Sequence, residues 1–154
     1  MSKKVGIIMG SDSDLPIIKK ATDMLKSLDI PFEVHQLNYV AEEKRLVDVY
    51  NAVNIFAIPS LQDNLPNTIV EAMACGIPCI GFNVGGIPEM IDHLHNGYVA
   101  EYKNVNDFAQ GIHWLLTEGE YELLSREASR KAANTYGENN IAMKYISIYK
   151  YTSI

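Results

Sequence analysis

Short, nearly continuous apolar runs alternate along the chain with stretches in which apolar residues recur every three or four positions. The runs fall near residues 4–9, 54–58, 78–82 and 98–100, and runs of this length are typical of parallel strands buried on both faces. A more polar segment at residues 33–38 is expected to form a further strand. The alternation predicts an α/β three-layer sandwich around a five-stranded parallel sheet, flavodoxin-like or Rossmann-like. We expect strand order 2-1-3-4-5, counted along the chain, which places the ligand crevice at the carboxyl ends of the first and third strands.

The segments between these runs have the spacing of amphipathic helices. We expect helices near residues 15–29, 42–51, 67–75, 104–116, 121–135 and 140–151. In the second of them Leu46, Val47, Val49 and Tyr50 are expected to face inward. The last is rich in Ile and Tyr, and it either docks on the sheet or leaves an apolar patch for a dimer contact. The expected state is therefore a monomer or a weak homodimer.

The richest stretch for candidate chemistry is residues 55–91, which reads as strand, polar loop, helix, strand and glycine loop. Asn67 or Thr68 is expected to cap the helix, Glu71 to lie in its first turn, and Gly76 to end it. Further along, Gly85 and Gly86 can adopt positive φ and bring backbone N–H groups close to a ligand. This pattern predicts a ligand site.

Composition narrows the class of protein. With 154 residues, 47% of them hydrophobic, the chain has enough material for a single domain spanning 1–154. A formal net charge of −6 without a basic stripe argues against a nucleic-acid partner. No apolar run approaches the roughly 18 residues of a membrane span, and no signal-peptide core is present, so a cytoplasmic location is expected. The two cysteines, Cys75 and Cys79, are expected to be reduced core thiols, and we expect neither a metal nor a cofactor.

A pair of acids marks the stretch more specifically. Asp63 and Glu71, with seven residues between them in PSLQDNLPNTIVEAMACGIP and followed by GGIPE, form a pattern that resembles the carboxy-terminal, nucleotide-sugar-binding lobe of retaining GT-B glycosyltransferases of family 4. The resemblance covers residues 34–150, and Asp63 stands where that family usually has Glu. It implies a nucleotide-sugar ligand: Glu71 for the ribose hydroxyls, and Asp63 with the Gly86 amide for the sugar, Gly85 being a further candidate in the same loop. The helix start, with Leu65, Asn67 and Thr68, supplies backbone N–H groups for phosphate.

The beginning of the chain resembles a different family. Residues 3–33, with the motif MGSDSD, are similar to the amino-terminal part of the carboxyaminoimidazole ribonucleotide mutases, whose loop holds a substrate phosphate and ribose. The resemblance makes five residues of this loop candidates for phosphate binding: Gly10, Ser11, Asp12, Ser13 and Asp14. The mutases carry a catalytic histidine in a Ser-Ala-His-Arg segment, whereas residues 38–41 here are Asn-Tyr-Val-Ala. The acid–base group of that chemistry is therefore missing.

Two resemblances that meet near residue 33, at a joint expected to fall between secondary-structure elements, suggest a chimera, engineered or recombined from two doubly wound parents. The first loop is negatively charged, where the transferase resemblance implies an Arg and a Lys that neutralise the donor diphosphate. The main hypothesis is hence a stable domain with no turnover and no catalytic residue, which binds phosphate or nucleotide weakly at the sheet crevice. The alternative hypothesis is the donor-binding lobe of a glycosyltransferase.

Overall fold

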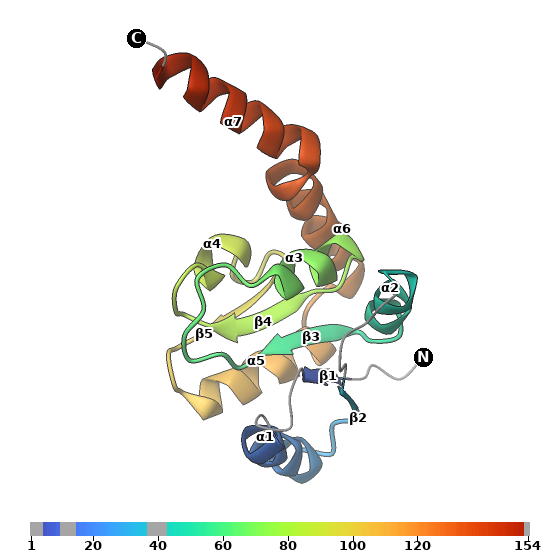
Figure 1. The fold of residues 1–154 in the computed structure, drawn as a ribbon. Helices are drawn as coiled ribbons and strands as arrows, with labels where there is room; N and C mark the ends of the chain where they lie inside the picture. Colours follow the sequence, from blue (N-terminus) through green and yellow to red (C-terminus); the bar gives the residue numbers. More distant parts are fainter. Residues whose placement is uncertain (1–4, 10–14, 37–42, 153–154) are drawn as a thin grey trace.

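The computed structural model describes residues 5–9, 15–36 and 43–152, and the sheet that it shows is parallel throughout. Its strands are β1 (Val5–Met9), β2 (Phe32–Gln36), β3 (Ile55–Ile58), β4 (Cys79–Phe82) and β5 (Gly97–Ala100). Their order is β2-β1-β3-β4-β5, so the predicted strand order and fold class are confirmed (Figure 1). Since β1 and β3 are neighbours in the sheet, the winding direction reverses between them, as a ligand crevice at this edge requires.

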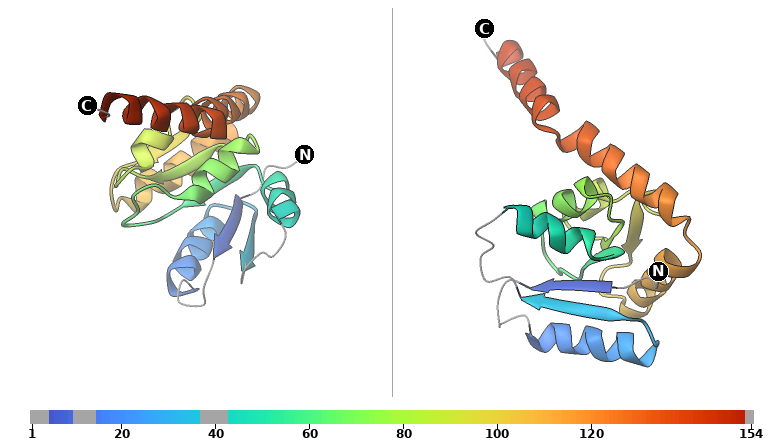
Figure 2. Two further views of the ribbon diagram at one scale, coloured as in Figure 1. Left: turned by 45° about the horizontal axis from the view of Figure 1, so that its top comes forward. Right: turned by 90° about the vertical axis from the view of Figure 1, so that its right-hand side faces the viewer.

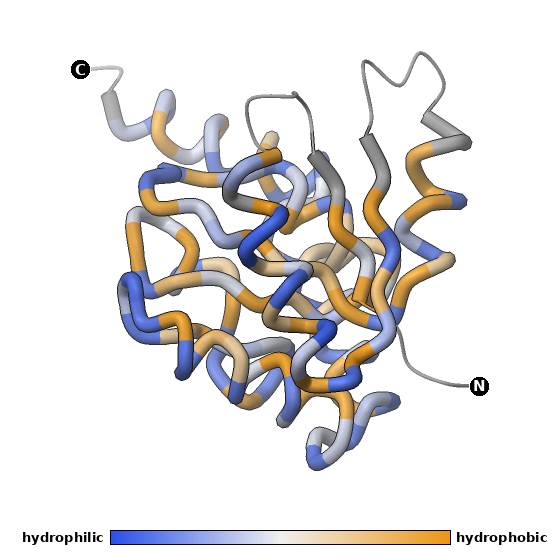
Figure 3. Tube along the Cα trace, turned by 90° about the horizontal axis from the view of Figure 1, so that it is seen from below, coloured by the Kyte–Doolittle hydropathy of each residue, from blue (hydrophilic) through white to orange (hydrophobic). Residues whose placement is uncertain are grey.

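Helices lie on both faces of the sheet. They are α1 (Leu15–Ser27), α2 (Glu43–Asn51), α3 (Asn67–Ala74), α4 (Ile87–Met90), α5 (Val105–Thr117), α6 (Tyr121–Lys131), the π-helical turn η2 (Ala132–Tyr136) and α7 (Glu138–Thr152). One buried cluster joins α2, α3, α4 and α6 to one face, and a second joins α1 and α5 to the other (Figures 1 and 2). Hydrophobic and hydrophilic positions are mixed along the trace, as in amphipathic helices that cover a sheet (Figure 3).

Three expectations about the elements need correction. Val47 of α2 is 42% exposed rather than inward, while Tyr50 on the same helix is buried. The helix expected over residues 121–135 ends at Lys131 and continues as the π-helical turn. The joint predicted near residue 33 was expected to fall between elements, but Glu33 lies inside β2, where it pairs with Gly6 of β1.

The last helix does not dock on the sheet, which rules out the first of the two placements considered for it. α7 packs against η2 and projects away from the domain (Figures 1 and 2). Its large apolar side chains are exposed, with Met143 at 64% and Tyr151 at 85%. None of the helices in the described part of the chain combines the length and apolarity that crossing a bilayer demands.

We expect the exposed apolar side chains of α7 to cause weak, concentration-dependent association. Light scattering over a dilution series should show an average mass that rises with concentration, because exposed apolar patches mark interaction surfaces. Replacing Met143 by lysine should reduce this rise without lowering the melting temperature, since the side chain is exposed. A mass that stays constant in the wild-type chain over the whole series would contradict this expectation.

Candidate functional site

Two loops meet at the carboxyl edge of the sheet, one after β3 (residues 59–66) and one after β4 (residues 83–86). Gly85 has a φ of 55°, which L side chains rarely adopt. A Cβ atom on Gly85 would overlap the carbonyl oxygen of Asp63, and one on Gly86 would overlap that of Asn64. The two backbones are thus in direct contact, and side chains larger than hydrogen do not fit there.

Only one of the two glycines has the predicted positive φ. Gly86 has a φ of −89° and caps the short helix α4. It is required for the close approach to Asn64 rather than for its backbone angle. The structure therefore brings Asp63, Gly85 and Gly86 together, as the sequence predicted, with a different reason for each glycine.

The acid loop is also held from the opposite side. The Tyr102 hydroxyl, in the segment after β5, donates a hydrogen bond to the carbonyl oxygen of Leu61 at 3.2 Å. In the same loop, Asp63 is half-buried and Leu65 is 49% exposed. The loop that carries the first acid is consequently fixed by contacts from two other loops.

The start of α3 differs from the prediction. Pro66, in an extended conformation with φ −66° and ψ 115°, is the N-cap, and no side chain caps the helix. Asn67 and Thr68 lie inside the first turn, where their backbone N–H groups are at the positive end of the helix dipole. Glu71 lies beyond that turn, so its predicted place in the first turn is wrong.

The end of α3 matches the prediction. Gly76 has a φ of 74°. Its N–H donates to the Met73 carbonyl at 2.9 Å, and the Ile77 N–H donates to the Ala72 carbonyl at 2.9 Å. These paired bonds form a Schellman motif, which satisfies the last carbonyls of the helix. The helix that presents Glu71 is thereby fixed at its carboxyl end.

Glu71 has a partner that the sequence did not reveal. The Tyr50 hydroxyl of α2 donates a hydrogen bond to Oε2 of Glu71 at 2.9 Å. Burial and the neighbouring carboxylate raise the pKa of Tyr50 above its ordinary value, so the hydroxyl remains a donor. The inward spacing of Tyr50 was a usable signal, because a buried tyrosine hydroxyl usually finds a hydrogen-bond partner.

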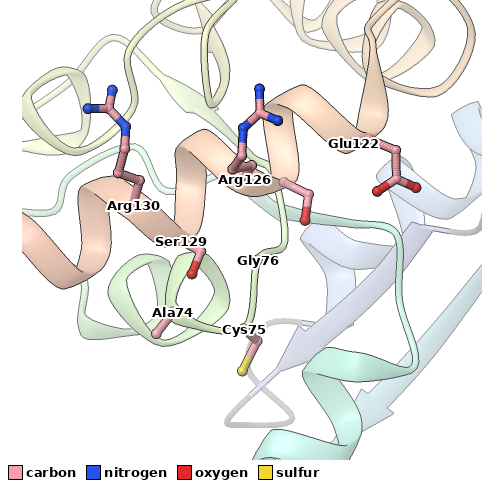
Figure 4. A pocket seen from close by; sticks show the side chains of 8 residues that line it. Ala74, Cys75, Gly76, Glu122, Arg126, Ser129 and Arg130 are labelled. Carbon is pink, nitrogen blue, oxygen red and sulfur yellow. The ribbon is translucent and has the colours of Figure 1, made fainter.

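A separate groove lies at the other end of α3, against α6. Ala74, Cys75, Gly76, Glu122, Ser125, Arg126, Ser129 and Arg130 line it. Figure 4 shows that the guanidinium groups of Arg126 and Arg130 point away from Cys75. Burial raises the pKa of the Cys75 thiol, which disfavours the reactive thiolate. The charged side chains and the thiol of this groove therefore do not converge on one ligand position.

The remaining sequence predictions concern the first loop, the two cysteines and metal binding. The candidate phosphate loop, Gly10, Ser11, Asp12, Ser13 and Asp14, lies outside the described residues, as do residues 37–42. Cys79 is buried as expected, while Cys75 is only partly so, and both are free thiols. Within the described ranges, no group of three or more His, Cys, Asp or Glu side chains is placed to hold a metal ion.

Comparison with known proteins gives a consistent result. A sequence profile described as "Glycosyl transferases group 1" matches residues 7–136. An uncharacterized glycosyltransferase of Haemophilus influenzae is 28% identical over 142 residues, which are 92% of this chain and 38% of that protein. The C-terminal domain of LpcC, a group 1 family protein of Francisella tularensis, superposes with a TM-score of 0.68 at 18% identity, covering 88% of this chain and 87% of that one. The pneumococcal O-GlcNAc transferase GtfA, in complex with UDP and GlcNAc, superposes with a TM-score of 0.66 at 19% identity, covering 97% of this chain and 29% of that one.

The extent of the match bears on the predicted chimera. It runs across residue 33 and includes most of the segment for which a mutase origin was predicted, so the comparisons give that origin no support. The chain spans less than half the length of the Haemophilus relative. Its sequence match and its fold agree, and the chain belongs to the group 1 glycosyltransferase family.

Proposed function

We propose that this chain is the donor-binding lobe of a group 1 glycosyltransferase and that its ligand is a nucleotide sugar. This is the alternative hypothesis from the sequence, and the comparisons favour it over a chimera without turnover. The observation that carries the proposal is the contact between the acid loop and the glycine loop at the carboxyl edge of the sheet. Ligands of open α/β sheets bind at this edge, next to the point where the winding reverses.

Each candidate residue has a place in this proposal. The backbone N–H groups at the start of α3, near Leu65, Asn67 and Thr68, face the donor diphosphate, which the helix dipole favours. Pro66 contributes no N–H, so the donors come from its neighbours. The loop at Gly10, Ser11, Asp12, Ser13 and Asp14 follows β1, the neighbour of β3, and its part in phosphate binding stays a prediction.

The acids and glycines have distinct roles in the proposal. Glu71 accepts hydrogen bonds from the ribose hydroxyls, and Asp63 accepts one from a sugar hydroxyl. Gly85 and Gly86 allow the acid loop to lie directly against their backbone, and in this proposal the Gly86 N–H donates a hydrogen bond to the sugar.

The family resemblance implies that transfer takes place between two lobes, with the acceptor on the other lobe. The relatives are longer than this chain, and 38% of the Haemophilus protein is matched. The proposed role for this chain is therefore to bind and orient the donor. The structural neighbour GtfA is in complex with UDP and GlcNAc. These ligands are the two parts of a nucleotide sugar, the ligand class proposed for this crevice.

Titration calorimetry with UDP tests the proposal. We expect the wild-type chain to bind UDP and the Glu71→Ala variant to bind it at least about tenfold more weakly. The reason is that hydrogen bonds to a charged acceptor contribute about 1.5–3 kcal/mol, and 1.4 kcal/mol corresponds to a factor of ten. Because the variant also leaves the Tyr50 hydroxyl without its acceptor, binding should be measured well below its melting temperature.

Glu122→Ala is the matched control, since it removes an exposed acid from α6 at the opposite end of α3. We expect this control to bind UDP as the wild-type chain does. If the wild-type chain gives no binding heat with UDP or with other nucleoside diphosphates, the proposed function is wrong.

A further inference from the structure

The hydrogen bond between Tyr50 and Glu71 connects α2 to the proposed donor site. The two side chains come from different helices and meet at 2.9 Å. Tyr50 is 1% exposed, while Glu71 is half-buried and keeps access to solvent. The pair thus joins a buried, packed side chain to a partly exposed carboxylate on α3.

Tyr50 is fixed by its surroundings. Its ring packs edge-on against Phe56 of β3, with ring centroids 5.8 Å apart and an interplanar angle of 76°. Its carbonyl oxygen accepts the Val53 N–H at 3.2 Å, in the turn that ends α2. A tyrosine side chain has two rotatable bonds before its ring, so a packed ring places its hydroxyl closely.

The carboxylate has capacity left after this bond. Its two oxygens offer about four lone-pair positions, and Tyr50 occupies one of them on Oε2. An unheld glutamate side chain would sample several rotamers and lose entropy on binding a ligand. A hydroxyl that holds one oxygen in advance reduces this cost.

We propose that Tyr50 is a positioning residue, which orients the Glu71 carboxylate for the ribose hydroxyls of the nucleotide. This inference rests on the proposed function and adds to it a residue that does not touch the ligand. A purely structural role, in which Glu71 only satisfies a buried hydroxyl, predicts that loss of the bond affects all ligands alike. A positioning role predicts an effect that depends on the ribose hydroxyls.

The test compares Tyr50→Phe with the wild-type chain in binding UDP and 2′,3′-dideoxy-UDP. We expect the variant to bind UDP about three- to tenfold more weakly, from the loss of one hydrogen bond, and to bind the dideoxy nucleotide as the wild-type chain does. Tyr98→Phe is the matched control, because it removes a 2.8 Å hydrogen bond from a tyrosine to Asp107 elsewhere in the fold. This control should leave the affinity for both nucleotides unchanged.

The outcomes separate the two proposals. A wild-type chain that binds neither nucleotide overturns the proposed function and this inference with it. A wild-type chain that binds UDP, combined with a Tyr50→Phe variant that weakens both nucleotides equally or neither, overturns this inference alone. Weakening confined to UDP supports it, and thermal melting of both tyrosine variants shows whether the fold is retained.

Discussion

Replacing Gly85 by alanine is expected to lower the free energy of unfolding by about 2–4 kcal/mol and to abolish measurable UDP binding. A φ of 55° disfavours any L side chain, by about 1–2 kcal/mol. In addition, the new methyl group would overlap the Asp63 carbonyl, so the acid loop must move away from the glycine loop. Urea unfolding measures the first effect, and titration calorimetry with UDP measures the second.

Two further glycine variants separate the contributions. Gly86→Ala meets the Asn64 carbonyl at an ordinary φ, so it should disturb the loop contact without the backbone penalty. Gly119→Ala is the control away from the site, where the new atom approaches the end of the Leu124 side chain at 2.7 Å. That side chain can rotate, and we expect a loss below about 1 kcal/mol with UDP binding retained. A Gly85→Ala variant as stable as Gly119→Ala would show that the loops can separate without cost.

The positions of most strands could be predicted because the physical cause is local. Strands buried on both faces must be apolar at nearly every position, and β1, β3 and β4 show this directly in the sequence. Glycine signals were equally readable: Gly76 ends α3 with the expected positive φ. In each case the pattern depends on neighbouring residues alone.

The errors arose from an adjacent residue in one case and from distant partners in the others. Asn67 and Thr68 are good caps in isolation, but Pro66 already has the extended backbone angles of a cap, so both were drawn into the helix. Helical spacing predicted α7 correctly, but it could not predict which surface the helix packs against. In the described part of the chain, the element that α7 mainly contacts is η2. Likewise, the hydrogen bond between Tyr50 and Glu71 joins residues whose spacing carries no common pattern.

The motif at the start of the chain has less weight than the match over most of the chain. Gly-Ser-Asp-Ser-Asp consists of small and capping residues, which any tight strand-to-helix turn favours. Two doubly wound families can therefore share it without a common origin. The match over residues 7–136 extends over most of the chain, and for that reason it has greater weight than the resemblance over residues 3–33.

Raising the pH from 8 to 11 is expected to lower the free energy of unfolding by about 4 kcal/mol. Burial raises the pKa of the Cys79 thiol above its ordinary value of 9.0, and burial with the Glu71 contact raises that of Tyr50 above 10.0. The unfolded chain releases these protons above pH 9 and 10, while the folded chain keeps them. Stability is therefore fully present below pH 9 and falls by about 1.4 kcal/mol per pH unit for each group as the pH rises.

Cys79→Ala isolates the first group. Cys79 is fully buried, and its thiol donates to the Ile77 carbonyl at 3.4 Å. The variant should be less stable at pH 8, yet it should lose about 1.4 kcal/mol less per pH unit between pH 9 and 11. Val53→Ala is the control, because it truncates a buried side chain that cannot titrate, and its stability should fall with pH as steeply as in the wild-type chain. Parallel pH profiles for Cys79→Ala and Val53→Ala would mean that the buried thiol does not retain its proton in the folded chain.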